Sequence, residues 1–314
     1  MMKVDSGFRA EGLSLRVYRF GNENNTYLIM EQDYMIAGFR LRMEGEPLVK
    51  AVANIGGFGV FAIDSTAEPN FRFVWSEEKA PAFTAELYRN DPVLTHNRFG
   101  RYEKGYIFET AYIGSDQTLT VWIAEGSRTA YFSGNLDVSL LRFACWIAFG
   151  VLIAPQKAVA IHTSTIVFHD KAVIFLGESG TGKSTHTRLW RENIEGATLL
   201  NDDSPIVRIH NGIPYVYGSP WSGKTPCYKT NSYELVGCVR LSQAPYNEIK
   251  KLKVMQAYAA LHPSCPPDFA YDEKLYDCIS QILNDILVKV PVYHLACLPN
   301  AEAAHLSCKT IFGV

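Results

Sequence analysis

The sequence predicts an α/β fold in two parts: a β-rich domain over residues 1–135 and an α/β domain over residues 156–314, joined by a helix over residues 136–155. Three observations lead to this prediction. Short runs of strand-forming residues, separated by Gly and Asn, fill the first part. A long apolar run follows it. Beyond that run, a buried strand, a glycine-rich loop and a helix come in direct succession, which indicates an α/β unit.

In the amino-terminal part, residues 13–18, 71–75 and 118–124 are rich in β-forming residues and predict strands. The glycine-rich segment at residues 54–62 fits a dinucleotide-binding pattern loosely, but Asp64 and its neighbours leave no room for the helix that the pattern needs. We expect a turn there. Because this domain carries no phosphate-binding motif, we expect it to recognise the acceptor, and a role as a packing platform stays open.

The joining helix is predicted from the apolar run Phe143–Ala154, with Asn135 or Asp137 as its cap and Pro155 after its end. Twelve residues are too few to span a bilayer, so the run indicates a buried helix. We therefore expect no membrane contact from it.

The second part contains the pattern G-x-x-x-x-G-K-[S/T], a Walker A or P-loop motif. The apolar run 172–176 predicts the buried strand before it, and residues 183–193 predict the helix after it. Glycines let backbone N–H groups turn around phosphate oxygens, the lysine reaches the outer phosphates, and the adjacent hydroxyl can bind Mg²⁺. The predicted nucleotide-binding residues are Gly177, Glu178, Ser179, Gly180, Thr181, Gly182, Lys183, Ser184 and Thr185.

An acidic pair, Asp202 and Asp203, follows a short predicted strand at residues 197–200. A hairpin with Asn211-Gly212 at its turn comes directly after, so the pair lies at a strand end. Two carboxylates beside a phosphate loop suit a metal ligand and a catalytic base, although Asp is also common in turns.

The rest of the second part predicts a strand at 236–241, helices at 257–262 and 272–289, a strand at 292–295 and a final helix capped by Asn300. The loop Ser219–Thr225 is a further candidate for binding. In it, Lys224 can reach a phosphate, and Trp221 can pack against a substrate or a base.

Composition limits the function. The chain has 314 residues, 47% hydrophobic and 20% charged, with a net charge of −2, which does not favour nucleic-acid binding. Its start, residues 1–20, is mixed and charged, unlike a signal peptide. Seven cysteines without a C-x₂-C pair indicate reduced thiols in the core. We expect a cytoplasmic protein, and a homo-oligomer stays open.

The order Ile161-His162-Thr163-Ser164, then the loop, then Asp202-Asp203, resembles the catalytic domain of HPr kinase/phosphorylase. That family shares a superfamily with the ATP-dependent phosphoenolpyruvate carboxykinases. The segment Pro291–Leu295, followed by a last helix, is also similar to uncharacterised relatives of the family. The resemblance covers roughly residues 155 to 314.

The resemblance implies ATP and Mg²⁺ as nucleotide and cofactor, and phosphoryl transfer to a serine or threonine hydroxyl of a protein or peptide. It implies Asp202, Lys183 and His162 as catalytic residues, with Asp202 as the base, and Ser184 and Asp203 as metal ligands. The two aspartates can exchange these roles. The family's late glycine-rich signature is absent, and residues 218–225 stand in its region, so HPr as acceptor and the phosphorylase activity are not implied.

Two other functions stay open at this point. One is a kinase for a small molecule or a carboxykinase-like enzyme. The other is a peptide-binding module gated by ATP that hydrolyses the nucleotide slowly. The destination of the γ-phosphate separates the three.

Overall fold

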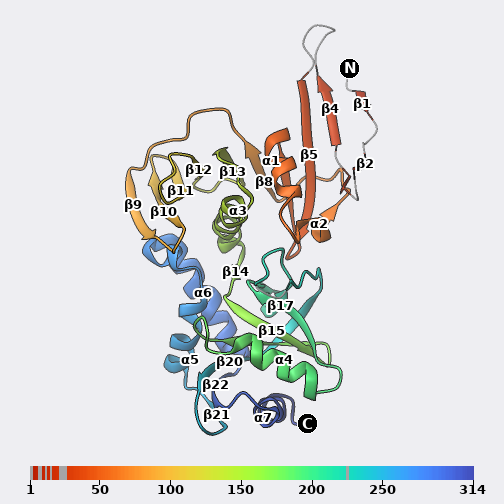
Figure 1. The fold of residues 1–314 in the computed structure, drawn as a ribbon, viewed down its shortest axis with the longest axis vertical. Coiled ribbons are helices and arrows are strands. Elements are labelled where there is room, and N and C mark those ends of the chain that lie inside the picture. Colours follow the sequence, from red (N-terminus) through yellow and green to blue (C-terminus); the bar gives the residue numbers. More distant parts are fainter. Residues whose placement is uncertain (1–2, 6–8, 11–12, 15, 21–26, 224–225) are drawn as a thin grey trace. The chain divides into compact units, whose positions relative to one another are not determined.

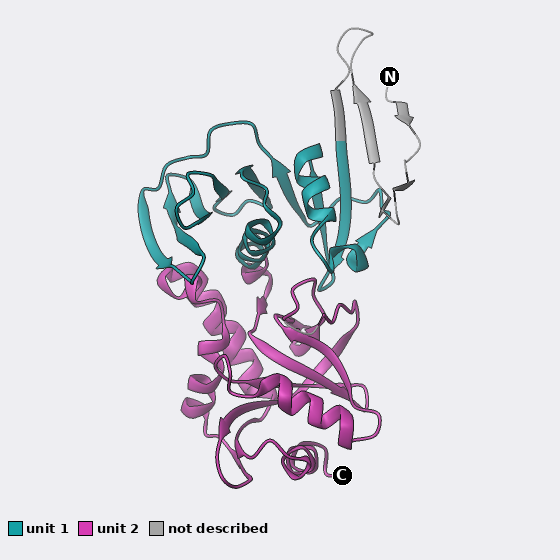
Figure 2. Ribbon diagram, viewed as in Figure 1, with its two compact units in different colours: residues 1–152 teal, residues 153–314 magenta. Residues whose placement is uncertain are grey.

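The computed structural model describes all of the chain except residues 1–2, 6–8, 11–12, 15, 21–26 and 224–225. The described chain is a mixed α/β protein with two large sheets, and it divides into two compact units, residues 1–152 and 153–314 (Figure 2). The boundary falls at the end of the helix that follows the first sheet.

The first unit is built on an 11-stranded sheet in the order β1-β4-β5-β6-β8-β13-β12-β11-β10-β9, with β7 paired to β5 (Figure 1). The strands are β1 Lys3–Asp5, β4 Arg16–Phe20, β5 Tyr27–Ile36, β6 Phe39–Glu44, β7 Ala62–Ile63, β8 Phe71–Trp75, β9 Ala85–Asn90, β10 Thr95–Tyr102, β11 Gly105–Tyr112, β12 Thr118–Ala124 and β13 Thr129–Gly134. A separate pair joins β2 Arg9–Ala10 to β3 Leu13–Ser14. The strands predicted at 71–75 and 118–124 are β8 and β12. The predicted strand at 13–18 falls on β3 and the start of β4, and residue 15 lies outside the described residues.

Two short helices were not predicted from the sequence. Helix α1 spans Glu46–Ala53, and helix α2, Phe58–Phe61, lies inside the segment predicted as a turn. Gly57 has a φ of 98°, which lets the chain reverse before α2, and both Phe58 and Phe61 are buried. The burial of these two rings, which local propensity does not reveal, accounts for the extra helical turn.

Helix α3, Val138–Ile153, is the predicted joining helix, and it continues as the 3₁₀ helix η1, Ala154–Gln156. Asp137 caps it, because its Oδ1 accepts from the backbone N–H groups of Ser139 at 2.9 Å and Leu140 at 3.3 Å. The helical stretch of residues 138–156 agrees with the predicted range 136–155, and it is long and apolar enough to cross a bilayer, which the twelve-residue run within it is not. However, 67% of its most apolar window is buried inside the protein, as in a core helix.

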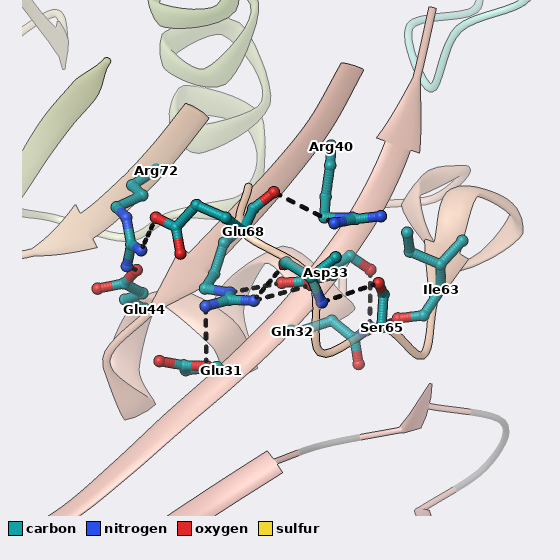
Figure 3. Close-up of polar contacts among 11 residues, drawn as sticks. Glu31, Gln32, Asp33, Arg40, Glu44, Ile63, Ser65, Glu68 and Arg72 are labelled. Carbon is teal, nitrogen blue, oxygen red and sulfur yellow. Dashed lines mark hydrogen bonds and ion pairs between the residues drawn. The ribbon is translucent and has the colours of Figure 1, made fainter. Parts of the chain in front are cut away.

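A buried ion pair lies in the first unit, at the junction of β5 and β6 (Figure 3). Arg42 donates to both carboxylate oxygens of Asp33, at 2.7 and 3.1 Å, and it lies 3.6 Å from Glu31. Asp33 is fully buried. A more exposed arginine nearby, Arg72, pairs with Glu44 and Glu68.

Replacing Arg42 by Met is expected to lower the free energy of unfolding by about 3–5 kcal/mol, because it removes the positive charge that offsets the buried Asp33 carboxylate. Chemical denaturation measures this change. Arg72→Met is the matched control: its side chain is 32% exposed, and its loss should cost about 1 kcal/mol or less. Equal losses in the two variants would contradict a special role for the buried pair.

The second unit has a nine-stranded sheet in the order β14-β18-β19-β20-β16-β15-β17, with β22 paired to β20 and β21 to β22. The strands are β14 Ala158–Ala160, β15 Thr163–Phe168, β16 Lys171–Leu176, β17 Thr198–Asp203, β18 Ile206–His210, β19 Ile213–Tyr217, β20 Ser232–Gln243, β21 Glu248–Lys251 and β22 Val292–Cys297. The helices are α4 Lys183–Asn193, α5 Val254–Leu261, η2 His262–Ser264, η3 Pro267–Tyr271, α6 Glu273–Lys289 and α7 Ala301–Phe312.

Sequence patterns located these elements well. Helix α6 begins after Asp272, whose side chain accepts from the Leu275 N–H. Its predicted core residues, Leu275, Ile279, Ile282, Leu283 and Ile286, are all buried. Asn300 caps α7 as predicted. All seven cysteines carry free thiols, and Cys145, Cys238, Cys265 and Cys308 are buried.

Strand direction brings four chain segments to one edge of this sheet. Strand β15 is antiparallel to both β16 and β17, and β20 runs parallel to β16 and to β22. Consequently β16, β17, β20 and β22 end where β15 begins. In open α/β sheets, ligands bind beyond the carboxyl ends of such strands.

A buried carboxyl group in η3, that of Asp268, predicts a pH effect on stability. Asp268 is 4% exposed, and burial raises its pKa to about 6. A raised pKa means that the folded state binds the proton more tightly, so the free energy of unfolding falls as the pH rises from about 4 to about 6. Asp268→Asn should therefore raise stability at pH 7 by on the order of 2 kcal/mol and change it little near pH 3. Melting curves across this pH range test the effect, with the exposed Asp277→Asn as control.

Candidate active site

The predicted phosphate-binding loop lies between the end of β16 and the start of α4. Every residue of β16 after Lys171 is buried, as predicted for the strand before such a loop. Gly180 and Gly182 have φ angles of 82° and 108°, and a Cβ at either would meet nothing within 4 Å. Glycine is therefore required here by the left-handed backbone conformation and not by lack of space.

The ammonium group of Lys183 lies over this loop. It donates to the carbonyl oxygens of Gly177 at 2.7 Å and Glu178 at 3.2 Å. Burial lowers its pKa, the carboxylates of Asp203 and Asp202 act in the opposite sense, and the cation of Arg240 lowers it further. Lys183 therefore lies close enough to the acidic pair for both carboxylates to act on its ammonium group.

The two aspartates have different partners. Asp202, 7% exposed, accepts a hydrogen bond from the Ser184 hydroxyl, with 3.0 Å between Oγ and Oδ1. Asp203 pairs instead with His162, with 3.0 Å between Oδ1 and Nδ1. This arrangement follows from the sheet, because β15 and β17 pair in the register Thr163 with Asp203 and Ser164 with Asp202. His162 therefore comes beside the acidic pair as β15 begins.

The loop after β19 closes one side of the site. Gly223 N–H donates to the carbonyl of Asp202 at 2.6 Å, and a Cβ on Gly223 would lie 2.6 Å from the same oxygen, so this position needs glycine. Asn201 holds the loop through hydrogen bonds to Ser219 and to the carbonyl of Trp221. Trp221 is 2% exposed, which places it in the core and not in contact with a substrate. Lys224 and Thr225 lie outside the described residues.

Two cavities of the second unit share the phosphate-binding loop as a wall. A polar one of about 370 Å³ is lined by His162, Thr163, Ser179, Gly180, Gly182, Lys183, Ser184, Thr185, Asp202, Asp203 and Gly223. An apolar one of about 550 Å³ is lined by Gly180, Thr181, Gly182, Thr185, His186, Leu189, Leu241, Gln243, Ala244, Cys297, Leu298 and Pro299. The structure thus brings together the predicted catalytic and metal-binding residues in one cavity. Of the predicted nucleotide-binding residues, Gly177, Glu178 and Thr181 do not line it; the Glu178 side chain is 88% exposed, and Thr181 lines the apolar cavity instead.

The oxygen atoms in the polar cavity suit Mg²⁺, which needs few protein ligands, better than a metal ion that is bound by protein side chains alone. Within the described residues, no three His, Cys, Asp or Glu side chains gather to hold a metal ion. Mg²⁺ usually takes only one or two protein ligands and completes an octahedron with water and phosphate oxygens at about 2.1 Å. Adjacent ligands of such an octahedron lie about 3 Å apart, which matches the 3.0 Å between Ser184 Oγ and Asp202 Oδ1. These two oxygens therefore have the spacing of adjacent Mg²⁺ ligands.

Sequence reasoning missed two lining residues, Thr163 and Gly223, and the supporting Asn201. Each had a weak signal: Thr163 follows His162 in the quoted motif, Gly223 lies in the candidate loop, and Asn201 precedes the acidic pair. It also missed His186, which lines the apolar cavity while being 3% exposed. Burial lowers the pKa of His186 to about 4, so its imidazole is neutral near pH 7.

No protein-family model matches the chain, and no curated protein matches it. Among solved structures, the chain is similar to the Hpr(Ser) kinase/phosphatase from Coxiella burnetii, with 12% identity and a TM-score of 0.27, over 47% of this chain and 85% of that one. A likeness with so low a TM-score carries no conclusion about function.

Proposed function

We propose that this protein is an ATP-dependent phosphotransferase that moves the γ-phosphate of ATP to a serine or threonine hydroxyl of a protein or peptide. The observation that carries the proposal is the convergence of Lys183, Ser184, the acidic pair and His162 on one polar cavity. Phosphoryl transfer needs little covalent help from a protein, so positioned charges of this kind can supply most of the catalysis.

In this proposal the loop backbone and Lys183 hold the phosphates, and Ser184 and Asp202 would hold Mg²⁺. Bound there, the ion would offset negative charge on the phosphate oxygens. Asp203 accepts the proton of the attacking hydroxyl. As it does so, the hydroxyl oxygen forms a bond to the γ-phosphorus, and the bond between that phosphorus and the leaving oxygen of ADP breaks. His162, 3.0 Å from Asp203, orients this carboxylate. The contacts therefore favour the reverse of the sequence-based division between the two aspartates.

The first unit is proposed to recognise the acceptor. By its place in the sheet order, β9 is an edge strand, and it is mostly exposed. An extended peptide can pair with such an edge through backbone hydrogen bonds. This role is tested by the rate of hydrogen exchange at the β9 amides, with and without a peptide that the protein phosphorylates. Pairing with the peptide should slow the exchange of these amides. Unchanged exchange across β9 would leave the unit as a packing platform.

Incubation with γ-labelled ATP, Mg²⁺ and a cell extract tests the function, with Lys183→Ala as the inactive comparison. The proposal expects label on serine or threonine of a protein or peptide. Label on a metabolite would instead indicate a small-molecule kinase. Release of inorganic phosphate alone would indicate a nucleotide-gated binding module. If the parent protein and Lys183→Ala transferred the same amount of label, the assignment of the site would be rejected.

A further inference from the structure

Arg240 is a partly buried cation at the edge of the sheet where the proposed reaction takes place. It lies near the end of β20, and its Cα pairs with that of Leu176, the last residue of β16 before the phosphate-binding loop. Its side chain is 21% exposed. Arg240 lines neither of the two cavities, and the chemistry proposed above gives it no role.

The protein leaves most of the guanidinium group of Arg240 without a partner. Such a group carries several N–H donors in one plane. Within the described residues, only Nη1 makes a hydrogen bond, to the carbonyl of Ala260 at 3.5 Å. The ion pair with Glu178 is long, 3.8 Å from Nη2 to Oε1, and the Glu178 side chain is 88% exposed. A pair with so exposed a partner contributes little, so Arg240 keeps donors and charge for an anionic ligand.

The contacts of Lys183 indicate where this ligand would lie. Lys183 donates to the carbonyls of Gly177 and Glu178, the first residues of the loop. Because the lysine of such a loop reaches the outer phosphates of a nucleotide, the γ-phosphate is expected over this end of the loop. Burial is the main cause that lowers the pKa of Lys183, and the Arg240 cation lowers it further, so the two charges lie close together. Arg240 is therefore beside the expected place of phosphoryl transfer.

One segment of chain contacts both Arg240 and the catalytic histidine. The carbonyl of Ala260 accepts from Arg240, and the carbonyl of Ser264 accepts from the backbone N–H of His162 at 2.7 Å. Four residues along α5 and η2 correspond to about 6–8 Å of helix axis. An extended peptide advances about 3.3 Å per residue. A side chain one or two residues from the attacking hydroxyl can therefore reach Arg240 while the hydroxyl lies beside Asp203.

A carboxylate is the anion that fits this position best. A guanidinium and a carboxylate form two parallel hydrogen bonds in one plane. Glu178 lies beside Arg240, and Asp202 and Asp203 act on the neighbouring Lys183, so negative charge is already present here. A singly charged carboxylate is repelled less by these groups than a doubly charged phosphate.

We infer that Arg240 binds the carboxylate of an aspartate or glutamate one or two residues from the phosphorylated serine or threonine, so that the protein selects acidic acceptor peptides. The inference rests on the proposed function. It adds the class of acceptor sequence and the residue that recognises it.

Transfer of label from γ-labelled ATP to synthetic peptides, with the full chain and Mg²⁺, tests the inference. Two sets of peptides each carry one serine among varied residues. In the acidic set, Asp or Glu stands one or two residues from the serine, and in the amide set Asn or Gln takes its place. The acidic set should show a kcat/KM at least about tenfold higher, because the amides keep the shape and lose the charge.

Variants of Arg240 then locate the preference. Arg240→Met keeps an apolar stem and loses the charge, so the ratio of acidic to amide peptides should fall close to one, mainly through a higher KM for the acidic set. Arg240→Glu should instead favour a third set with Lys or Arg in these positions, which a merely structural role would not produce.

Arg188→Met is the matched control, because Arg188 is an exposed residue of α4 that pairs with Glu192, and this variant should keep the full ratio. If Arg240→Met does not fold, Arg240→Lys takes its place. The lysine keeps the charge and loses the paired donors, so the ratio should fall in part.

The outcomes distinguish this inference from the proposed function. Equal labelling of the acidic and amide sets by the parent protein would overturn the role of Arg240 and leave the kinase activity standing. An equal loss for both sets in Arg240→Met would also overturn it, since the arginine would then act on the transferred phosphate. If the parent protein labelled neither set and only released inorganic phosphate, the proposed transfer to peptides would itself be rejected.

Discussion

Replacing Lys183 by Ala is expected to lower phosphoryl transfer by at least about 10²-fold. The ammonium group lies over the loop, between the carbonyl oxygens of Gly177 and Glu178 and the acidic pair, where the transferred phosphate would carry its charge. Its loss removes a fixed positive charge that acts most strongly in the transition state, so kcat should fall more than affinity for ATP.

The measurement is transfer of label from γ-labelled ATP, together with melting temperature. Without nucleotide, the variant should melt close to the parent protein, and the stabilisation by Mg²⁺ and ATP should shrink, because a ligand stabilises only the state that it binds. Lys171→Ala is the matched control, since Lys171 lies at the other end of β16 and pairs with Glu234. If Lys183→Ala turned over at nearly the parent rate, the loop would have no part in phosphoryl transfer.

Asp203→Asn and Asp202→Asn should each reduce activity strongly, but in different ways. Asp203 pairs with His162 and is proposed as the base, so its amide should lower kcat by about 10²–10⁴-fold with little effect on nucleotide binding. Asp202 is hydrogen-bonded to Ser184, so its amide should raise the Mg²⁺ concentration needed for half-maximal activity. The amide is nearly the same size as the carboxylate, which limits structural damage.

Titration of each variant with Mg²⁺ at saturating ATP distinguishes these effects. His162→Gln provides a further check. Because His162 is proposed to orient the base, its replacement should lower kcat in the same way as Asp203→Asn, but by a smaller factor. If Asp203→Asn changes the Mg²⁺ requirement and Asp202→Asn changes only kcat, the original division of roles is correct and the reverse is wrong. If both variants behaved like the parent protein, the two aspartates would have no role in catalysis or metal binding.

The sequence by itself located the elements that carry the site, for local reasons. The apolar run at 172–176, the glycines of the loop and the helix formers after Lys183 dictate a strand, a turn and a helix in that order. The Asn211-Gly212 turn places the acidic pair at a strand end. Caps at Asp137, Asp272 and Asn300 mark helix starts, because each side chain satisfies backbone N–H groups within its own turn.

Tertiary structure alone decided which of these groups face one another. The antiparallel register of β15 with β17 pairs His162 with Asp203 and leaves Asp202 for Ser184, and no local pattern separates two adjacent aspartates in this way. Burial of Trp221 and the apolar cavity around His186 likewise depend on strands far apart in the chain. Short-range propensity fixes single elements, whereas pairing and packing between distant segments fix the distances on which binding and catalysis depend.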